Sequence, residues 1–264
     1  MPTLEQLLSI YQSFFSYPDI AGSSLALGII LAIIFGLIWL ACYKPPYRNI
    51  IKKHWLWIVL IISPFFTLAA FTFIQVPLQS RWGFEAIQTW GDETLKSLLL
   101  ISIIPAAVIS GLVVEGAKMV PAVIYWFANH RKISLKTGLL IGAAAGAGFG
   151  VLETQHVFNT VFIQGWDIDI IQSYGLFAYI SLFWERFFIT ALHVAVCALA
   201  GYGLAKGKGW QFYLLASILH AIMEYILIII KAQIIEFEGG EVLIALWAAI
   251  ITAAALWIRF TKAK

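Results

Sequence analysis

Long apolar stretches separated by short polar connections dominate the chain. A run of about 20 apolar residues is long enough to cross a hydrocarbon core of about 30 Å as an α-helix. Seven such runs predict membrane-spanning helices at about 23–43, 54–77, 95–129, 137–162, 179–205, 210–232 and 242–260. The pattern therefore predicts an all-α polytopic bundle in which residues 1–264 form one integral-membrane domain.

The third run, 95–129, is much longer than a single span requires. Pro105 and Pro121 lie inside it, and proline removes an amide donor and clashes with the preceding helical turn. We therefore expect this segment to be bent or broken near these prolines. The preceding connection, 79–94, has mixed charge and several aromatic residues, which favours a position along the membrane surface.

The charges of the connections alternate along the chain. Basic residues gather in 44–53, 131–136, 206–208 and 259–264, whereas 79–94, 167–169 and 236–241 are mixed or acidic. Because positively charged connections stay in the cytoplasm, this alternation predicts an extracytoplasmic segment 1–22 and a cytoplasmic carboxyl terminus. No basic residue precedes the first run, so we expect that run to be retained as a helix of a multi-pass cell-membrane protein.

The composition agrees with a location in the lipid bilayer. Hydrophobic residues make up 61% of the chain and charged residues 12%, compared with about a quarter charged in soluble domains. The net charge of +3 is small and divided among short clusters, which indicates no nucleic-acid partner. Cys42 and Cys197 have no metal-ligand spacing and are interpreted as core residues, and no pattern indicates an oligomeric state.

Several ionisable residues nevertheless lie inside the apolar runs. An ionised side chain in lipid costs at least about 2.5 kcal/mol unless it faces a partner or a polar cavity. Spacings of three, seven and four residues place the pairs Glu115 and Lys118, Arg186 and His193, and His220 and Glu224 each on one helix face. We expect these side chains to converge on one buried polar site, together with Glu153.

Glutamate and histidine in a partly dry site can carry out general-base hydrolysis of a peptide bond. The same residue types can hold a divalent metal such as zinc, with His193, His220 and Glu153 as candidate ligands. The HExxH spacing is absent, so only ligand type supports the metal hypothesis. Two alternatives are a scaffold or sensor whose polar cluster only joins helices, and a transporter, although no internal repeat is evident.

The order of four motifs resembles a known group of enzymes. These motifs are Glu115-Gly-Ala-Lys118, Phe149-Gly-Val-Leu-Glu153, Glu185-Arg186 with His193, and His220 four residues before Glu224. They resemble the PrsW and YhfC branches of the CPBP-type membrane-embedded peptidases, which include the type II CAAX prenyl endopeptidases. The resemblance implies a glutamate-dependent intramembrane peptidase with catalytic-core helices in 95–232.

The resemblance also implies roles for individual residues. Glu115, Glu153, His193 and His220 correspond to the catalytic residues, and Lys118, Arg186 and Glu224 to supporting ones. Val114 stands where this group has the first glutamate of a pair, which leaves both Glu115 and Glu153 as candidate bases, and Glu224 replaces the usual Asp or Asn. The implied substrate is a membrane protein or a lipidated peptide, and relatives on this fold include a non-catalytic scaffold.

Overall fold

The computed structural model describes residues 1–46, 52–166 and 169–263, and within these ranges it is helical without strands. Seven helical stretches are long and apolar enough to cross a membrane, judged by length and composition, which confirms the predicted number of spans. They are Gly22–Cys42, His54–Trp90, Leu99–Ala128, Leu135–Ile163, Gly175–Ala205, Gly209–Lys231 and Phe237–Thr261.

The helical elements have the following bounds, in chain order. They are α1 Leu4–Ser13, α2 Gly22–Cys42, α3 His54–Ala70, the π-helical η2 Phe71–Gln75, α4 Val76–Trp90, α5 Asp92–Ser97, α6 Leu99–Ser102, α7 Ile104–Ala128, α8 Leu135–Ile163, α9 Asp169–Ala205, α10 Gly209–Lys231 and α11 Phe237–Thr261. The described ranges omit Asp167 and part of the basic connection 44–53, so those two predicted loops lie partly outside them.

The second span is longer than its apolar run indicates. The prediction that it ends near residue 77 was wrong, because α3, η2 and α4 form one helical stretch that reaches Trp90. Pro77 lies in the first turn of α4, directly after the π-helical turn, where a missing amide donor is tolerated. Residues 79–90 are therefore part of this helix.

The third run is broken, and one of its interruptions falls close to Pro105, as predicted. The interruptions fall at Leu98 and Ile103, and Pro105 lies in the first turn of α7, a position that suits proline. Pro121 is buried within α7, which continues through it without interruption. The predicted break at Pro121 was therefore wrong, and α7 forms one helix of 25 residues.

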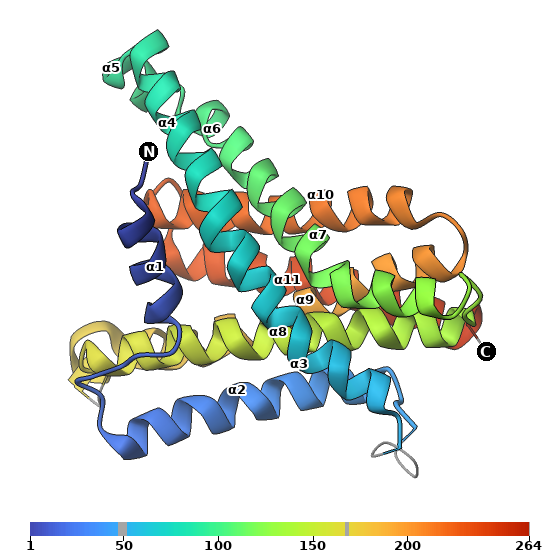
Figure 1. Ribbon diagram of the computed structural model, residues 1–264. Helices are drawn as coiled ribbons and strands as arrows, with labels where there is room; N and C mark the ends of the chain where they lie inside the picture. Colours follow the sequence, from blue (N-terminus) through green and yellow to red (C-terminus); the bar gives the residue numbers. More distant parts are fainter. Residues whose placement is uncertain (47–51, 167–168, 264) are drawn as a thin grey trace.

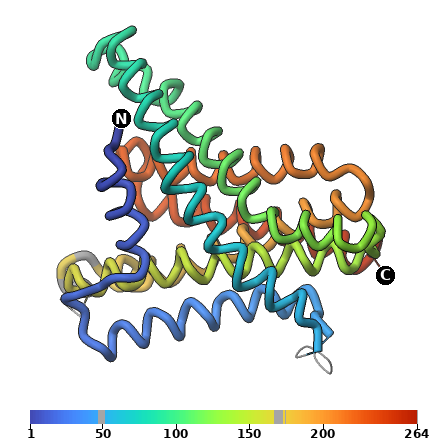
Figure 2. The backbone as a smooth tube through the Cα atoms, viewed as in Figure 1, coloured from blue at the N-terminus to red at the C-terminus, as the bar shows by residue number. Residues whose placement is uncertain are grey.

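Helices α8 and α9 lie at the centre of the bundle (Figure 1). Helix α8 packs against α9, α2 and α3, while α9 also packs against α10 and α11. The tube view shows the α7–α8 and α9–α10 connections near the carboxyl terminus, and the α10–α11 connection at the opposite end (Figure 2). The basic connections 131–136 and 206–208 thus share one end of the bundle, as the alternation predicts, while the side of the membrane stays a prediction.

The small residues of α8 permit a very close approach to α9. A Cβ atom on Gly142 would overlap the carbonyl of Cys197, and one on Gly146 would overlap the carbonyl of His193. Glycine at these two positions lets the backbones touch and fixes the depth of His193 relative to α8. The glycine-rich pattern in the sequence therefore serves helix packing beside the polar residues.

Replacing Gly146 with valine is expected to destabilise the protein. The added side chain has to displace the backbone of α9 at His193, and overpacking of this kind costs about 1–3 kcal/mol or more. The thermal unfolding midpoint in detergent should fall by several degrees for Gly146→Val. Gly83→Val is the matched control, since a Cβ atom on Gly83 in α4 meets open space, and an equal midpoint for both variants would contradict the packing argument.

Candidate active site

A buried ion pair on α7 lies at the centre of the polar site. Glu115 and Lys118 are three residues apart, both side chains are 0% exposed, and the ammonium of Lys118 bonds Glu115 Oε1. Two opposite charges removed from solvent stabilise each other only when the remaining donors and acceptors are also satisfied. The neighbouring helices supply those further partners.

Helices α8 and α9 extend this pair into a network. His193 Nδ1 lies 3.0 Å from Lys118 Nζ, and His193 Nε2 lies 2.9 Å from Glu153 Oε2. The imidazole of His193 therefore connects the cation on α7 with the carboxylate on α8. Both ring nitrogens have a partner, so the orientation of the ring is fixed by its neighbours.

His220 on α10 approaches the same carboxylate from the other side. Its Nδ1 lies 2.8 Å from Glu115 Oε1, and its ring centroid lies 5.3 Å from that of His193. Close backbone contact at Gly111, where a Cβ atom would overlap the carbonyl of Ser217, holds α7 against α10. Glu115 is thus enclosed by partners from three helices.

Glu115, His193 and His220 form a group that can hold a metal ion. One ligand atom from each residue lies within 4.8 Å of the others, and all three residues are buried. The Nε2 atom of His220 is buried and makes no hydrogen bond, and its charged neighbour is Glu224, whose Oε1 lies 3.6 Å away. Two imidazoles and a carboxylate are a common donor set for zinc, so the residues present fit a divalent metal.

This group differs in one member from the metal ligands that the sequence suggested. Glu153 was a candidate ligand with the two histidines, whereas Glu115 completes the group of three. Glu153 instead lies beside His193, in the position of a carboxylate that orients a ligating imidazole. Its side chain is 26% exposed, so it is more accessible than Glu115.

The supporting residues lie around the edge of this network. Arg186 NH1 is 3.7 Å from Glu153 Oε2, and its other terminal nitrogen bonds Glu185. Glu224 Oε1 lies 3.6 Å from His220 Nε2 with a side chain 29% exposed. The structure thus brings all seven sequence-predicted site residues together, and the partly exposed carboxylates lie at its border.

Cys197 is a contact that the sequence interpretation missed. It was assigned to the core, and it is buried there, but its thiol also donates to Glu115 Oε2 at 3.3 Å. Cys197 follows His193 by four residues on α9, so the two side chains share one helix face. The four-residue spacing from His193 was the feature of the sequence that could have placed Cys197 beside the polar residues.

A short segment near the amino terminus covers the neighbourhood of Glu153. The ring of Phe14 stacks on His156 with centroids 3.9 Å apart, and the Tyr17 hydroxyl lies 3.0 Å from His156 Nδ1. His156 is three residues after Glu153 on α8. The sequence pattern does not indicate these contacts, because the partners of His156 come from a segment far away in the chain.

Comparison with protein families gives one match. A family model described as the PrsW family intramembrane metalloprotease matches residues 52–256, which include the whole polar network, the second to sixth candidate spans and most of the seventh. No curated protein and no solved structure matches the chain.

Proposed function

This chain belongs to the PrsW family of intramembrane metalloproteases, and we propose that its peptidase reaction takes place at Glu115, His193 and His220. The observation that carries this proposal is the buried group of three possible ligand side chains, each from a different helix. The family assignment makes the chain a multi-pass membrane peptidase and does not favour the scaffold alternative.

We assign these three residues as the metal ligands and zinc as the ion. Imidazole and carboxylate donors in a closed apolar shell suit zinc among the common divalent metals. A zinc ion held by these residues would supply Lewis-acid chemistry, since it would polarise the scissile carbonyl and lower the pKa of bound water. The hydrogen bond from His193 to Glu153 supports this assignment, because a ligating histidine is commonly oriented by a carboxylate on its other ring nitrogen.

Glu153 is the general base in this proposal. A base must reach water and substrate, and Glu153 is partly exposed, whereas Glu115 is enclosed by Lys118, His220 and Cys197. Glu153 takes a proton from the attacking water and returns a proton to the amine that leaves when the peptide bond breaks. Arg186, whose NH1 lies 3.7 Å from Glu153 Oε2, supplies a positive charge beside the carboxylate before it accepts the proton from water.

The substrates are membrane-embedded protein segments, as the intramembrane family assignment implies. A lipidated peptide is the second substrate class that the sequence resemblance suggests. The number of residues between a side chain and the basic end of its helix indicates its depth in the bundle. By this measure Glu153 and Glu224 lie further from the basic end than His193 and Glu115. We therefore propose that the scissile bond enters from the end opposite the basic connections.

New amino termini in membrane proteins test this function directly. We expect labelling of amino termini in membrane fractions to reveal cleavage sites within spans when the natural chain is expressed. These sites should disappear with Glu153→Gln and persist with Glu85→Gln, since Glu85 is an exposed glutamate paired with Arg81 on α4. Identical cleavage sites from all three proteins would overturn the proposal.

Replacing Lys118 with methionine is expected to strengthen zinc binding about tenfold. The ammonium of Lys118 contacts Glu115 and His193 Nδ1, so it competes with a metal ion for two proposed ligands. Removing that cation also leaves Glu115 in need of a counter-charge, which zinc can supply. Competition against a chromophoric chelator gives the affinity, with the exposed Lys96→Met as control. Weaker zinc binding in Lys118→Met would contradict this competition.

A further inference from the structure

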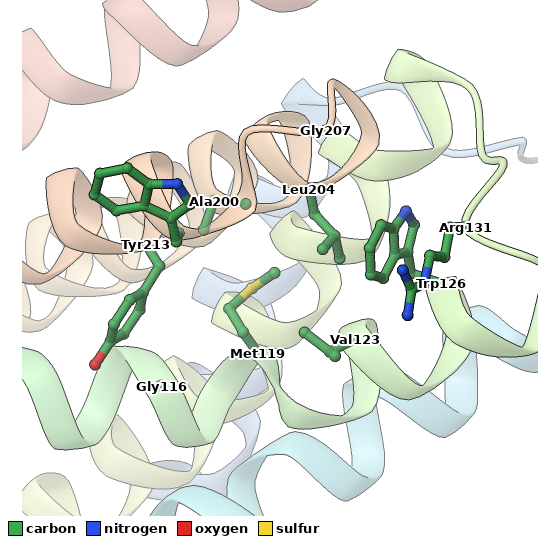
Figure 3. Close-up of a pocket in the computed structure, with 11 residues that line it drawn as sticks. Gly116, Met119, Val123, Trp126, Arg131, Ala200, Leu204, Gly207 and Tyr213 are labelled. Atoms are coloured by element: carbon green, nitrogen blue, oxygen red, sulfur yellow. The ribbon is translucent and has the colours of Figure 1, made fainter.

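An apolar cavity lies between α7 and the α9–α10 connection, away from the polar network. Its volume is about 590 Å³. Figure 3 shows the side chains of Met119, Val123 and Leu204 between the two walls, with Trp126 and Arg131 at one end and Tyr213 at the other. The cavity is within the range of roughly 300–1,000 Å³ that is typical of ligand sites.

The cavity is separate from the proposed peptidase site. Its α7 wall is formed by Gly116, Met119, Val123 and Trp126, whose spacing places them along one stripe of the helix. Glu115 and Lys118 occupy the neighbouring stripe and are fully buried. A ligand in the cavity would therefore not contact the ionisable groups of the site.

The mouth of this cavity is strongly basic. Arg131 is the one charged side chain among the described residues that line the cavity. Lys132 follows it, and Lys206 and Lys208 flank the lining residue Gly207. The connections 129–134 and 206–208 contain no Asp or Glu, so these four cations have no acidic neighbour in either segment. An anionic group would be attracted to this mouth.

The aromatic residues place the mouth at the level of lipid headgroups. Trp126 and Trp210 line the cavity near the ends of α7 and α10, and tryptophan near a helix end is typical of the membrane interface. The guanidinium of Arg131 lies 5.5 Å from the Trp126 ring centroid and 4.7 Å from that of Phe127. At the inner end, the Tyr213 hydroxyl donates to the carbonyl of Leu112 at 2.9 Å. The cavity is thus charged at the headgroup level and apolar within.

We propose that this cavity binds an anionic phospholipid, with one acyl chain between α7 and the α9–α10 connection and the phosphate beside Arg131. An apolar interior below a cationic mouth matches a chain joined to a negatively charged headgroup. Basic pockets between membrane helices bind anionic lipid headgroups by the same combination of charge and burial. The proposal does not depend on the peptidase mechanism.

Native mass spectrometry of the purified protein tests this lipid site. The protein is equilibrated in detergent with equal amounts of dioleoyl phosphatidylglycerol and dioleoyl phosphatidylcholine, and the retained lipid is identified. We expect one phosphatidylglycerol molecule to be retained at least about tenfold over phosphatidylcholine, since each basic residue near an anionic headgroup contributes to binding. The double variant Arg131→Gln with Lys206→Gln should lose about tenfold of this preference.

Two further variants separate a site from general lipid contact. Leu204→Trp, or Val123→Phe if the first does not fold, fills the cavity and should abolish the retained lipid without changing surface charge. Lys262→Gln removes an exposed cation near the carboxyl terminus and should leave retention unchanged. Equal retention of the two lipids, or unchanged retention after the cavity is filled, would overturn the proposal.

Discussion

Replacing His220 with glutamine is expected to reduce peptidase turnover at least about a thousandfold, which corresponds to about 4 kcal/mol of lost transition-state stabilisation. His220 supplies one of the three proposed metal ligands, and its side chain is buried in the polar network. Glutamine retains a polar side chain able to bond Glu115, so the fold should survive while the imidazole ligand is lost. Turnover of a fluorogenic membrane-segment substrate in nanodiscs measures the effect.

The control for His220→Gln is a histidine outside the network. His54 is exposed at the start of α3, so His54→Gln should retain turnover within about twofold, as expected for surface changes. His220→Gln could lose activity because a metal ligand is missing or because the site is misaligned. Zinc affinity separates these two explanations, because only the loss of a ligand weakens zinc binding. If His220→Gln had full activity, His220 could not be a ligand in the reaction.

Replacing Glu153 with glutamine is expected to lower kcat about 10²–10⁴-fold while the protein still binds zinc. Glutamine keeps the shape of the side chain and can still accept from His193 Nε2, but it cannot take a proton from water. Zinc binding should therefore survive in Glu153→Gln but weaken in His220→Gln, because Glu153 contacts a proposed ligand and is not one of the group of three.

Two outcomes would contradict the role of Glu153 as base. Loss of zinc together with activity would make Glu153 a ligand, as the sequence alone suggested, and retention of activity would transfer the role to Glu115. Glu85→Gln is again the matched control, because Glu85 is exposed and bonded to Arg81 on α4, outside the polar network. The thermal unfolding midpoint of each variant shows that the comparison is made on folded protein.

The amino-acid sequence predicts the number of spans and the convergence of the buried ionisable residues. Ionisable residues in lipid are costly, so each one in an apolar run indicates a partner on another helix. Glu115, Glu153, His193 and His220 were identified in this way, and they contact one another in the structure. The PrsW part of the motif resemblance is confirmed by the family match, while the YhfC branch and the wider superfamily stay predictions.

The sequence does not determine how each helix is rotated about its axis. The rotation of the helices places Glu115, and not Glu153, in the group of three with the two histidines. The contact between Cys197 and Glu115 depends on the same rotation. The extension of the second span to Trp90 was missed because polar residues in α4 lower the hydropathy of a segment that is still helical. The uninterrupted path of α7 through Pro121 shows that packing can override a local helix breaker.

The metal content of the purified protein tests the central claim most directly. Elemental analysis gives the metal content of the natural chain and of Glu115→Gln. Peptidase turnover is measured on the same samples while a chelator removes the metal. We predict about one zinc per chain, loss of zinc in Glu115→Gln, and loss of turnover in proportion to the zinc removed, with recovery when zinc is restored. Full peptidase activity in protein that contains no divalent metal would contradict the account.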